Sequence, residues 1–155
     1  MANVLIGSYT ARLDASGRIK IPEKFREVIE QVYGKDLFVT SLSDDSIKIY
    51  PLSVWLAMTD LTSEGALHLR PDVRKFMLRV NRNGSRHELD SKGRVLISQA
   101  LREKAKLRDE VEVLGLSNHL EIWNKDVLDG TLEEKPLSDE DFESIARLIP
   151  RGKPE

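Results

Sequence analysis

The sequence predicts an α+β fold built from two copies of one structural repeat, each with the element order ββαββ. Two stretches of the chain resemble one another, apolar residues alternate in each stretch as they do in strands, and helical spacing follows. A repeat of about 45 residues rarely buries a stable core alone. We therefore expect the two copies to pack against each other about a pseudo-twofold axis.

The repetition is clearest around two tight turns, LDASGR at residues 13–18 and LDSKGR at residues 89–94. A shift of 76 residues makes these pairs identical: Leu13/Leu89, Asp14/Asp90, Gly17/Gly93, Arg18/Arg94, Ile21/Ile97, Arg26/Arg102 and Glu27/Glu103. Farther along, SIKIYPLSVW aligns with HLEIWNKDVL. We expect repeat 1 at residues 7–53, a helical connector at 54–83, repeat 2 at 84–128 and an acidic tail at 129–155.

Repeat 1 begins with a predicted β-hairpin whose turn contains Gly17. Apolar residues alternate with polar ones around this turn, at Tyr9, Ala11, Leu13, Ile19 and Ile21. Pro22 suits the first turn of a helix that ends at Gly34, and the strands LFVTSL and SIKIY follow. Repeat 2 has the same plan, with Ser98 as the helix N-cap and EVEVLGL and HLEIW as strands.

Helices are also predicted outside the repeats. Between the repeats, Ser53 begins one helix that runs through Trp55 and Met58, and Pro71 begins a second, amphipathic helix. In the tail, Ser138 and Asp141 have the spacing of a capping box, and apolar residues follow at helical spacing. The simplest interpretation of the tail is a solvated helix after a flexible linker at residues 130–138.

The two turns have a structural interpretation. A carboxylate at Asp14 can accept backbone N–H groups of the turn that follows, and Gly17 can adopt the positive φ that closes it. The same holds for the second turn. We therefore interpret Asp14, Gly17, Asp90 and Gly93 as turn-forming residues rather than ligand contacts.

Cationic side chains surround these turns. Strand alternation leaves three of them outward on one face of the first hairpin, Arg12, Arg18 and Lys20. The second hairpin adds Arg86, Lys92 and Arg94. An alternative is that Arg18 and Arg94 only pair with the turn aspartates, as surface ion pairs that contribute about 0–1 kcal/mol.

Charge is unevenly distributed along the chain, although the net charge is only -2. Residues 70–94 hold eight cations against three carboxylates, whereas residues 126–143 hold eight carboxylates against one lysine. Such a chain can combine an anion-binding face with an acidic segment that masks the bulk charge.

Composition and motifs argue against an enzyme. The chain has no cysteine, which excludes disulfides, thiolate nucleophiles and sulfur-ligated zinc. His68, His87 and His119 lack the spacing of a helical metal pair, and catalytic or nucleotide-binding motifs are absent. We expect no metal, cofactor or small-molecule substrate. The initial apolar run is too short for a signal peptide, so we expect a cytoplasmic protein with no membrane partner.

The segments YTARLDASGRIKIPEKFRE, HELDSKGRVLISQALREKAKL and HLEIWNKDV resemble the MraZ family, bacterial transcriptional regulators with two SpoVT–AbrB-type domains in one chain. The resemblance runs from Gly7 to Gly130. It implies a swapped-hairpin AbrB-like β-barrel with peripheral helices, and a ring-shaped homo-oligomer such as an octamer. Ala15 and Ser16 replace a lysine that is frequent in the family's first turn, and Ser98 replaces a frequent proline.

The resemblance also implies a function. Family members bind direct repeats in double-stranded promoter DNA, usually that of their own cell-division and cell-wall gene cluster, at the nucleoid. The DNA-contacting arginines of the family match Arg18 and Arg94. We predict that Lys92, Lys20, Arg12 and Arg86 support them. The alternative is an AbrB-like protein-interaction or assembly module that does not bind DNA directly.

Overall fold

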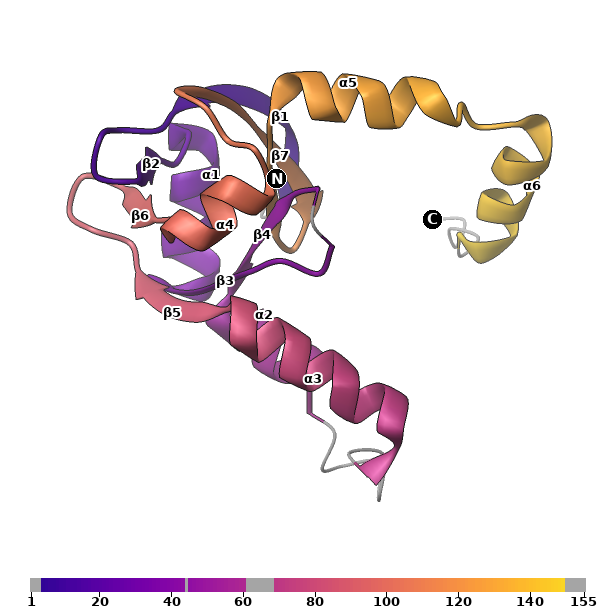
Figure 1. Cartoon of the computed structure of the whole chain (residues 1–155), viewed down its shortest axis with the longest axis horizontal. Helices are drawn as coiled ribbons and strands as arrows, with labels where there is room; N and C mark the ends of the chain where they lie inside the picture. The colour runs from indigo at the N-terminus through magenta and orange to yellow at the C-terminus, as the bar shows by residue number, and fades with distance from the viewer. Residues whose placement is uncertain (1–3, 44, 61–68, 150–155) are drawn as a thin grey trace, which may run out of the picture. The chain divides into compact units, whose positions relative to one another are not determined.

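The structure is a computed structural model in which residues 4–43, 45–60 and 69–149 are described. Within these residues the chain is α+β, with an antiparallel six-stranded sheet, a two-stranded ribbon and six α-helices (Figure 1). Two compact parts can be distinguished, the body (Met1–Lys125) and the C-terminal segment (Asp126–Glu155). None of the helices in the described part of the chain combines the length and apolar character needed to cross a membrane.

Both repeats have the predicted ββαββ order. Repeat 1 contains β1 (Leu5–Arg12), β2 (Arg18–Lys20), α1 (Glu23–Val28), β3 (Asp36–Thr40) and β4 (Ile47–Pro51). Repeat 2 contains β5 (Ser85–Glu88), β6 (Arg94–Leu96), α4 (Gln99–Lys104), β7 (Glu110–Ser117) and β8 (Leu120–Trp123). A π-helical turn, η1 (Ile29–Tyr33), extends α1 to the predicted end at Gly34, where φ is 92°. Ser98 caps α4 by accepting the Leu101 backbone N–H at 3.3 Å, as predicted.

The strand order of the sheet, β1-β7-β8-β4-β3-β5, contains a pseudo-twofold axis. Replacing every strand by its counterpart in the other repeat gives the same order in reverse. The axis therefore passes between β4 and β8, where the equivalent residues Lys48 and Glu121 face each other. In the ribbon the equivalent residues Ile19 and Val95 also face each other.

The prediction that the first two strands of each repeat pair with each other as a hairpin was wrong. β1 runs along β7, and it meets β2 only at a bridge between Leu13 and Ile19. β2 pairs with β6 of the other repeat instead. Two equivalent backbone bonds join the repeats, from Ile21 N to Gly93 O at 2.9 Å and from Ile97 N to Gly17 O at 2.8 Å. This exchange places the apolar side chains of both repeats in one core, which a single repeat could not form.

The body contains two clusters of buried apolar residues. The larger one lies among the sheet, the ribbon, α1 and α4, and it includes the fully buried Ile19, Phe25 and Ile97. The smaller one packs α2 (Leu52–Met58) and α3 (Pro71–Asn83) on β3 and β4. There Trp55 stacks on Phe38 with a ring separation of 4.7 Å. α2 begins one residue before the predicted Ser53, and α3 begins at the predicted Pro71.

The C-terminal segment contains α5 (Lys125–Glu134), apart from its first residue, and α6 (Asp139–Leu148). The linker predicted from residue 130 was wrong in its start, because α5 includes Gly130 and ends only at Glu134. The surrounding leucine and glutamate residues offset the cost of about 1 kcal/mol for a helical glycine. The capping box of α6 is confirmed, since Ser138 and Asp141 bond reciprocally at 2.9 and 3.1 Å.

Candidate nucleic-acid interface

One face of the β2–β6 ribbon carries cations from both repeats. Opposite residues in the ribbon are Arg18 and Leu96, Ile19 and Val95, and Lys20 and Arg94. Ile19 and Val95 are buried, so alternation places the remaining residues on the other face. We call Arg18, Lys20 and Arg94 the cationic face. Lys20 is exposed, Arg18 is half-buried, and 34% of the Arg94 side chain is accessible.

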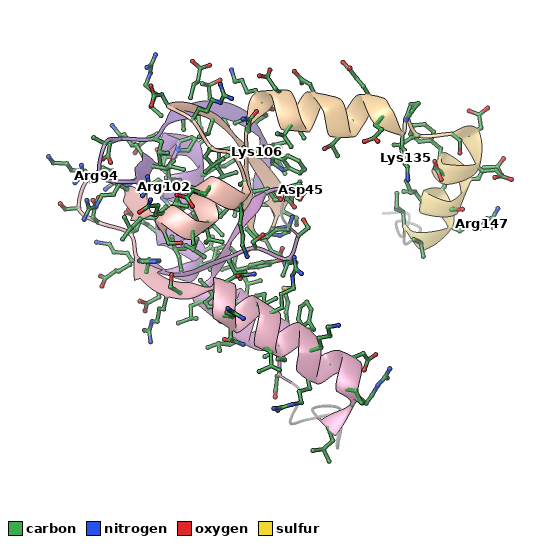
Figure 2. All side chains as sticks on the ribbon, in the orientation of Figure 1. Asp45, Arg94, Arg102, Lys106, Lys135 and Arg147 are labelled. Atoms are coloured by element: carbon green, nitrogen blue, oxygen red, sulfur yellow. The ribbon has the colours of Figure 1, made fainter. Side chains whose placement is uncertain are left out.

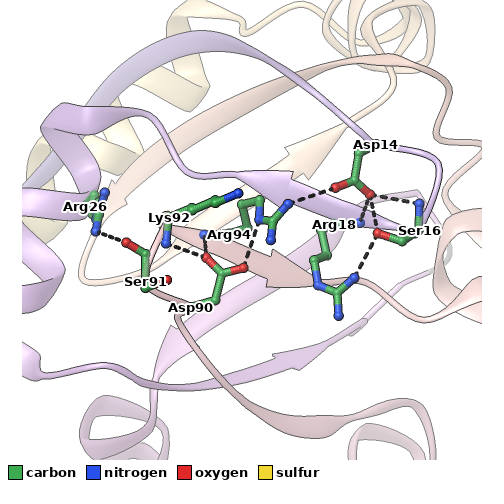
Figure 3. A network of polar contacts seen from close by, with 8 residues as sticks. All are labelled: Asp14, Ser16, Arg18, Arg26, Asp90, Ser91, Lys92 and Arg94. Carbon is green, nitrogen blue, oxygen red and sulfur yellow. Dashed lines mark hydrogen bonds and ion pairs between the residues drawn. The ribbon is translucent and has the colours of Figure 1, made fainter.

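The first turn is organised by the Asp14 carboxylate (Figure 3). Asp14 Oδ1 accepts the backbone N–H groups of Ser16 and Arg18, both at 2.9 Å, and the Ser16 hydroxyl at 2.7 Å. The hydrogen bond from Arg18, followed by those from Ser16, lowers the pKa of Asp14. Gly17 closes the turn with φ 85°. The start of β2 is therefore fixed by a network within the turn.

The second turn has the same backbone bonds and an added ion pair. Asp90 Oδ1 accepts the N–H groups of Lys92 at 2.9 Å and Arg94 at 2.8 Å. Asp90 Oδ2 accepts Arg94 Nε at 2.8 Å, and Arg94 Nη1 lies 3.7 Å from Asp14 Oδ2. The Arg94 backbone bond contributes most to lowering the pKa of Asp90, and burial opposes it. Arg94 therefore links both turns (Figure 3).

The two arginines of the cationic face differ in their partners. Arg94 pairs with the turn aspartate Asp90, as the alternative interpretation of the sequence expected for both arginines. Arg18 Nη1 instead donates to Ser16 Oγ at 2.8 Å. Among the residues that the structure describes, Arg18 and Lys20 form no ion pair with a carboxylate. Their charges are thus less neutralised than that of Arg94.

Two further arginines, Arg26 and Arg102, support the turns, and the sequence interpretation gave them no role. Arg26 extends from α1, and its Nη2 donates to the Ser91 carbonyl at 3.0 Å (Figure 3). The Cδ and Nε atoms of the same side chain lie over Gly93. Arg102, labelled on α4 in Figure 2, lies over Gly17, and its Nε donates to the Ile97 carbonyl at 3.0 Å. Each helix therefore supports the turn of the other repeat. The sequence signal that could have indicated this role is that both repeats have an arginine at this equivalent position.

The supporting cations lie in different places. Arg12 ends β1 and, with Lys20, lines a shallow groove of about 470 Å³. Lys92 is exposed at the second turn. Arg86 lies on β5, which pairs with β3, and its Nη2 is 3.2 Å from Asp36 Oδ2. The structure thus brings Arg12 beside Lys20 and leaves Arg86 outside the ribbon.

In the described part of the chain, no group of three or more side chains that could hold a metal ion converges. Nε2 of His87 is 2.7 Å from Ser85 Oγ, and burial lowers the pKa of His87. His119 stacks on Tyr50 with a ring separation of 4.6 Å. His68 lies outside the described residues.

Replacing Gly93 with alanine should destabilise the protein by about 1–3 kcal/mol, because φ is positive and the new Cβ meets Arg26. Gly93 has φ 75°, and that Cβ would lie 2.7 Å from Arg26 Cδ. Urea unfolding measures the change. Gly130→Ala is the control, since its Cβ would have no neighbour within 4 Å and alanine favours a helix. Equal stability of Gly93→Ala and the unmodified chain would contradict the strained turn.

Chemically, the cationic face is suited to anions. Guanidinium groups can donate two parallel hydrogen bonds to phosphate oxygens or to O6 and N7 of guanine, and ammonium groups attract phosphates. Donors on a rigid scaffold lose less conformational entropy on binding than donors on a mobile loop. The turn networks and the two supporting arginines provide that rigidity here.

Comparisons with known proteins identify similar chains. Residues 82–147 match the family model described as "MraZ protein, putative antitoxin-like". The chain is 34% identical to a "Transcriptional regulator MraZ" of Acidobacterium capsulatum, over 92% of this chain and 97% of the relative. Proteins of the same name from Syntrophobacter fumaroxidans and Finegoldia magna are 35% and 32% identical. These matches cover 92% and 90% of this chain, and 92% and 94% of the respective relatives.

Proposed function

The chain belongs to the MraZ family of transcriptional regulators, and on this premise we propose that it binds double-stranded promoter DNA through the cationic face of the β2–β6 ribbon. The observation that carries the proposal is the arrangement of Arg18, Lys20 and Arg94. They come from both repeats and share one side of a ribbon whose opposite side is buried. The family name denotes a regulator and not an enzyme.

In this mechanism the cations have separate tasks. Arg18 donates to the Ser16 hydroxyl but has no carboxylate partner among the described residues, so it is the first candidate for bidentate contact with a guanine. The terminal nitrogens of Arg94 contact DNA while its Nε holds Asp90. Lys20, Lys92 and Arg12 neutralise phosphates, which positions the ribbon without reading sequence. Arg86, paired with Asp36, has a peripheral part.

The proposal extends to the assembly. The strand exchange between repeats supports the swapped-hairpin barrel that the resemblance implies. Ile6 and Leu116 face each other on β1 and β7 and are 60% and 43% exposed, which supports association of copies into a ring such as an octamer. A ring presents cationic faces at regular intervals to repeated promoter elements, so weak contacts combine by avidity. The proposed target is the cell-division and cell-wall cluster that contains its own gene, at the nucleoid in the cytoplasm.

Selection of genomic fragments tests this function. Fragments of the organism's DNA that the full-length protein retains should be enriched for one upstream region with spaced repeats. Affinity for that region should fall linearly with salt on a log–log plot, with a slope of about 0.9 per phosphate contact. Retained fragments that come from no preferred region, together with an affinity for DNA that does not depend on salt, would argue for the protein-interaction alternative.

A further inference from the structure

A second cationic surface lies in the body, apart from the β2–β6 ribbon. It is a groove of about 410 Å³ lined by residues of α3 and α4, and we call it the α3–α4 groove. The described residues that line it are Lys75, Leu78, Arg79, Arg82, Asn83 and Lys104. Four of these six side chains are cationic, and none is a carboxylate.

The groove collects its charges from two helices. Lys75, Arg79 and Arg82 are spaced by four and three residues, which places them along one side of α3. Lys104 extends into the groove from α4, and its Nζ donates to Oδ1 of Asn83 on α3 at 3.0 Å. In the described structure, Lys75, Arg82 and Lys104 form no ion pair with a carboxylate. At the start of the same helix, by contrast, Arg70 pairs with Asp72 at 2.8 Å.

Solvation of a surface helix does not account for this arrangement. Exposed helical faces normally intersperse both charge signs, and like charges one turn apart destabilise a helix. From Val73 to Asn83, α3 contains no acidic residue at all. The lysine of α4 adds a further positive charge to the same groove. An anion in the groove would be attracted by Lys75, Arg82 and Lys104 together.

We propose that the α3–α4 groove binds the phosphate backbone of DNA that flanks the element contacted by the cationic face, without reading its sequence. This inference rests on the proposed function. Only Ile97 and Ser98 separate β6 from α4, so the groove and the cationic face belong to one body. The cations of α3 extend over about 10 Å, which suits a continuous line of phosphates.

The test compares Lys75→Ala/Lys104→Ala with the control Arg74→Ala, in the full-length protein. Arg74 is exposed on the same helix but does not line the groove. Binding of the enriched promoter fragment and of an unrelated duplex is measured by fluorescence anisotropy from 50 to 200 mM salt. The double variant should bind both duplexes several-fold more weakly, and its log–log salt slope should be smaller by about 2. The preference for the promoter fragment and the slope of Arg74→Ala should stay unchanged.

The outcomes separate this inference from the proposed function. If the groove variant keeps the slope of the unmodified protein while alanines at Arg18 and Lys20 abolish promoter preference, the groove inference is overturned and the proposed function stands. If neither variant changes DNA binding, both fail. If the groove variant binds DNA normally but loses binding to poly-glutamate, the groove accepts an acidic polypeptide, and the inference is likewise overturned.

Discussion

The double variant Arg18→Ala/Lys20→Ala is expected to bind the enriched promoter fragment about 30- to 1,000-fold more weakly at 150 mM salt. A bidentate arginine–guanine pair contributes about 1–3 kcal/mol, and a lost phosphate contact adds to it. These two side chains have no carboxylate partner in the described structure, so their removal leaves the Asp90 network intact. Fluorescence anisotropy with labelled duplexes measures the affinity.

The matched control is Arg74→Ala/Arg147→Ala, which removes the same charge from exposed helical positions outside the ribbon. It should retain affinity within a few-fold. Native mass spectrometry should give the same number of subunits for both variants as for the unmodified protein, and their thermal stability should be unchanged. Neither pair of residues belongs to the core. Full promoter affinity of Arg18→Ala/Lys20→Ala would show that DNA contacts a different surface.

Arg94→Ala is a less selective test of the same surface. Arg94 joins the Asp14 and Asp90 carboxylates, so its loss leaves two negative charges near each other without their shared cation. A weaker complex would then reflect both a missing contact and an altered turn. Arg18 and Lys20 are therefore the sharper positions at which to examine recognition.

Local structure could be predicted from the sequence because it depends on neighbouring residues. Alternation and helical spacing identified the ββαββ order, and Gly34, Ser98 and Ser138 marked helix ends that the structure confirms. These features depend on backbone sterics and nearby hydrogen bonds. The start of the linker after α5 was missed because a single Gly130 is a weak helix breaker between good helix formers.

Partners distant in sequence could not be predicted in the same way. A strand as short as Arg18–Lys20 shows which side chains share a face but not which strand lies beside it. The candidate cations were therefore assigned to two separate hairpins, although Lys20 and Arg94 are neighbours in one ribbon. The roles of Arg26 and Arg102 depend on the same exchange, because each contacts a turn of the other repeat.

Glu121→Gln is expected to lower the free energy of unfolding by about 3 kcal/mol at pH 7, or roughly 6–12 °C in melting temperature. Glu121 and Lys48 face each other at the pseudo-twofold axis, with 2.7 Å between Oε2 and Nζ and side chains only 13% and 14% exposed. Trp123 Nε1 donates to the same carboxylate at 2.8 Å. Glutamine would leave the ammonium of Lys48 largely buried without a counter-charge.

The pH dependence of stability provides an independent measure. Burial raises the pKa of Glu121, but hydrogen bonds from His119, Lys48 and Trp123 and the charge of Lys48 outweigh it, lowering the pKa from 4.5 to about 2. The folded state thus binds fewer protons than the unfolded state in this range. The stabilisation is complete above pH 4.5 and is lost as pH falls toward 2. Denaturant unfolding from pH 7 to pH 2 should show this loss in the unmodified protein and a smaller loss in Glu121→Gln.

Glu110→Gln is the control, because Glu110 also lies 2.7 Å from a lysine, Lys125, but both side chains are more than 40% exposed. Its effect should be much smaller than that of Glu121→Gln, and equal effects would contradict the importance of burial.

An exact duplication would place identical residues opposite each other at the axis, and two like charges there would repel. Glu121→Lys should therefore destabilise the protein more than Glu121→Gln. Adding Lys48→Glu should restore part of the loss, since it restores the ion pair without the hydrogen bond from Trp123.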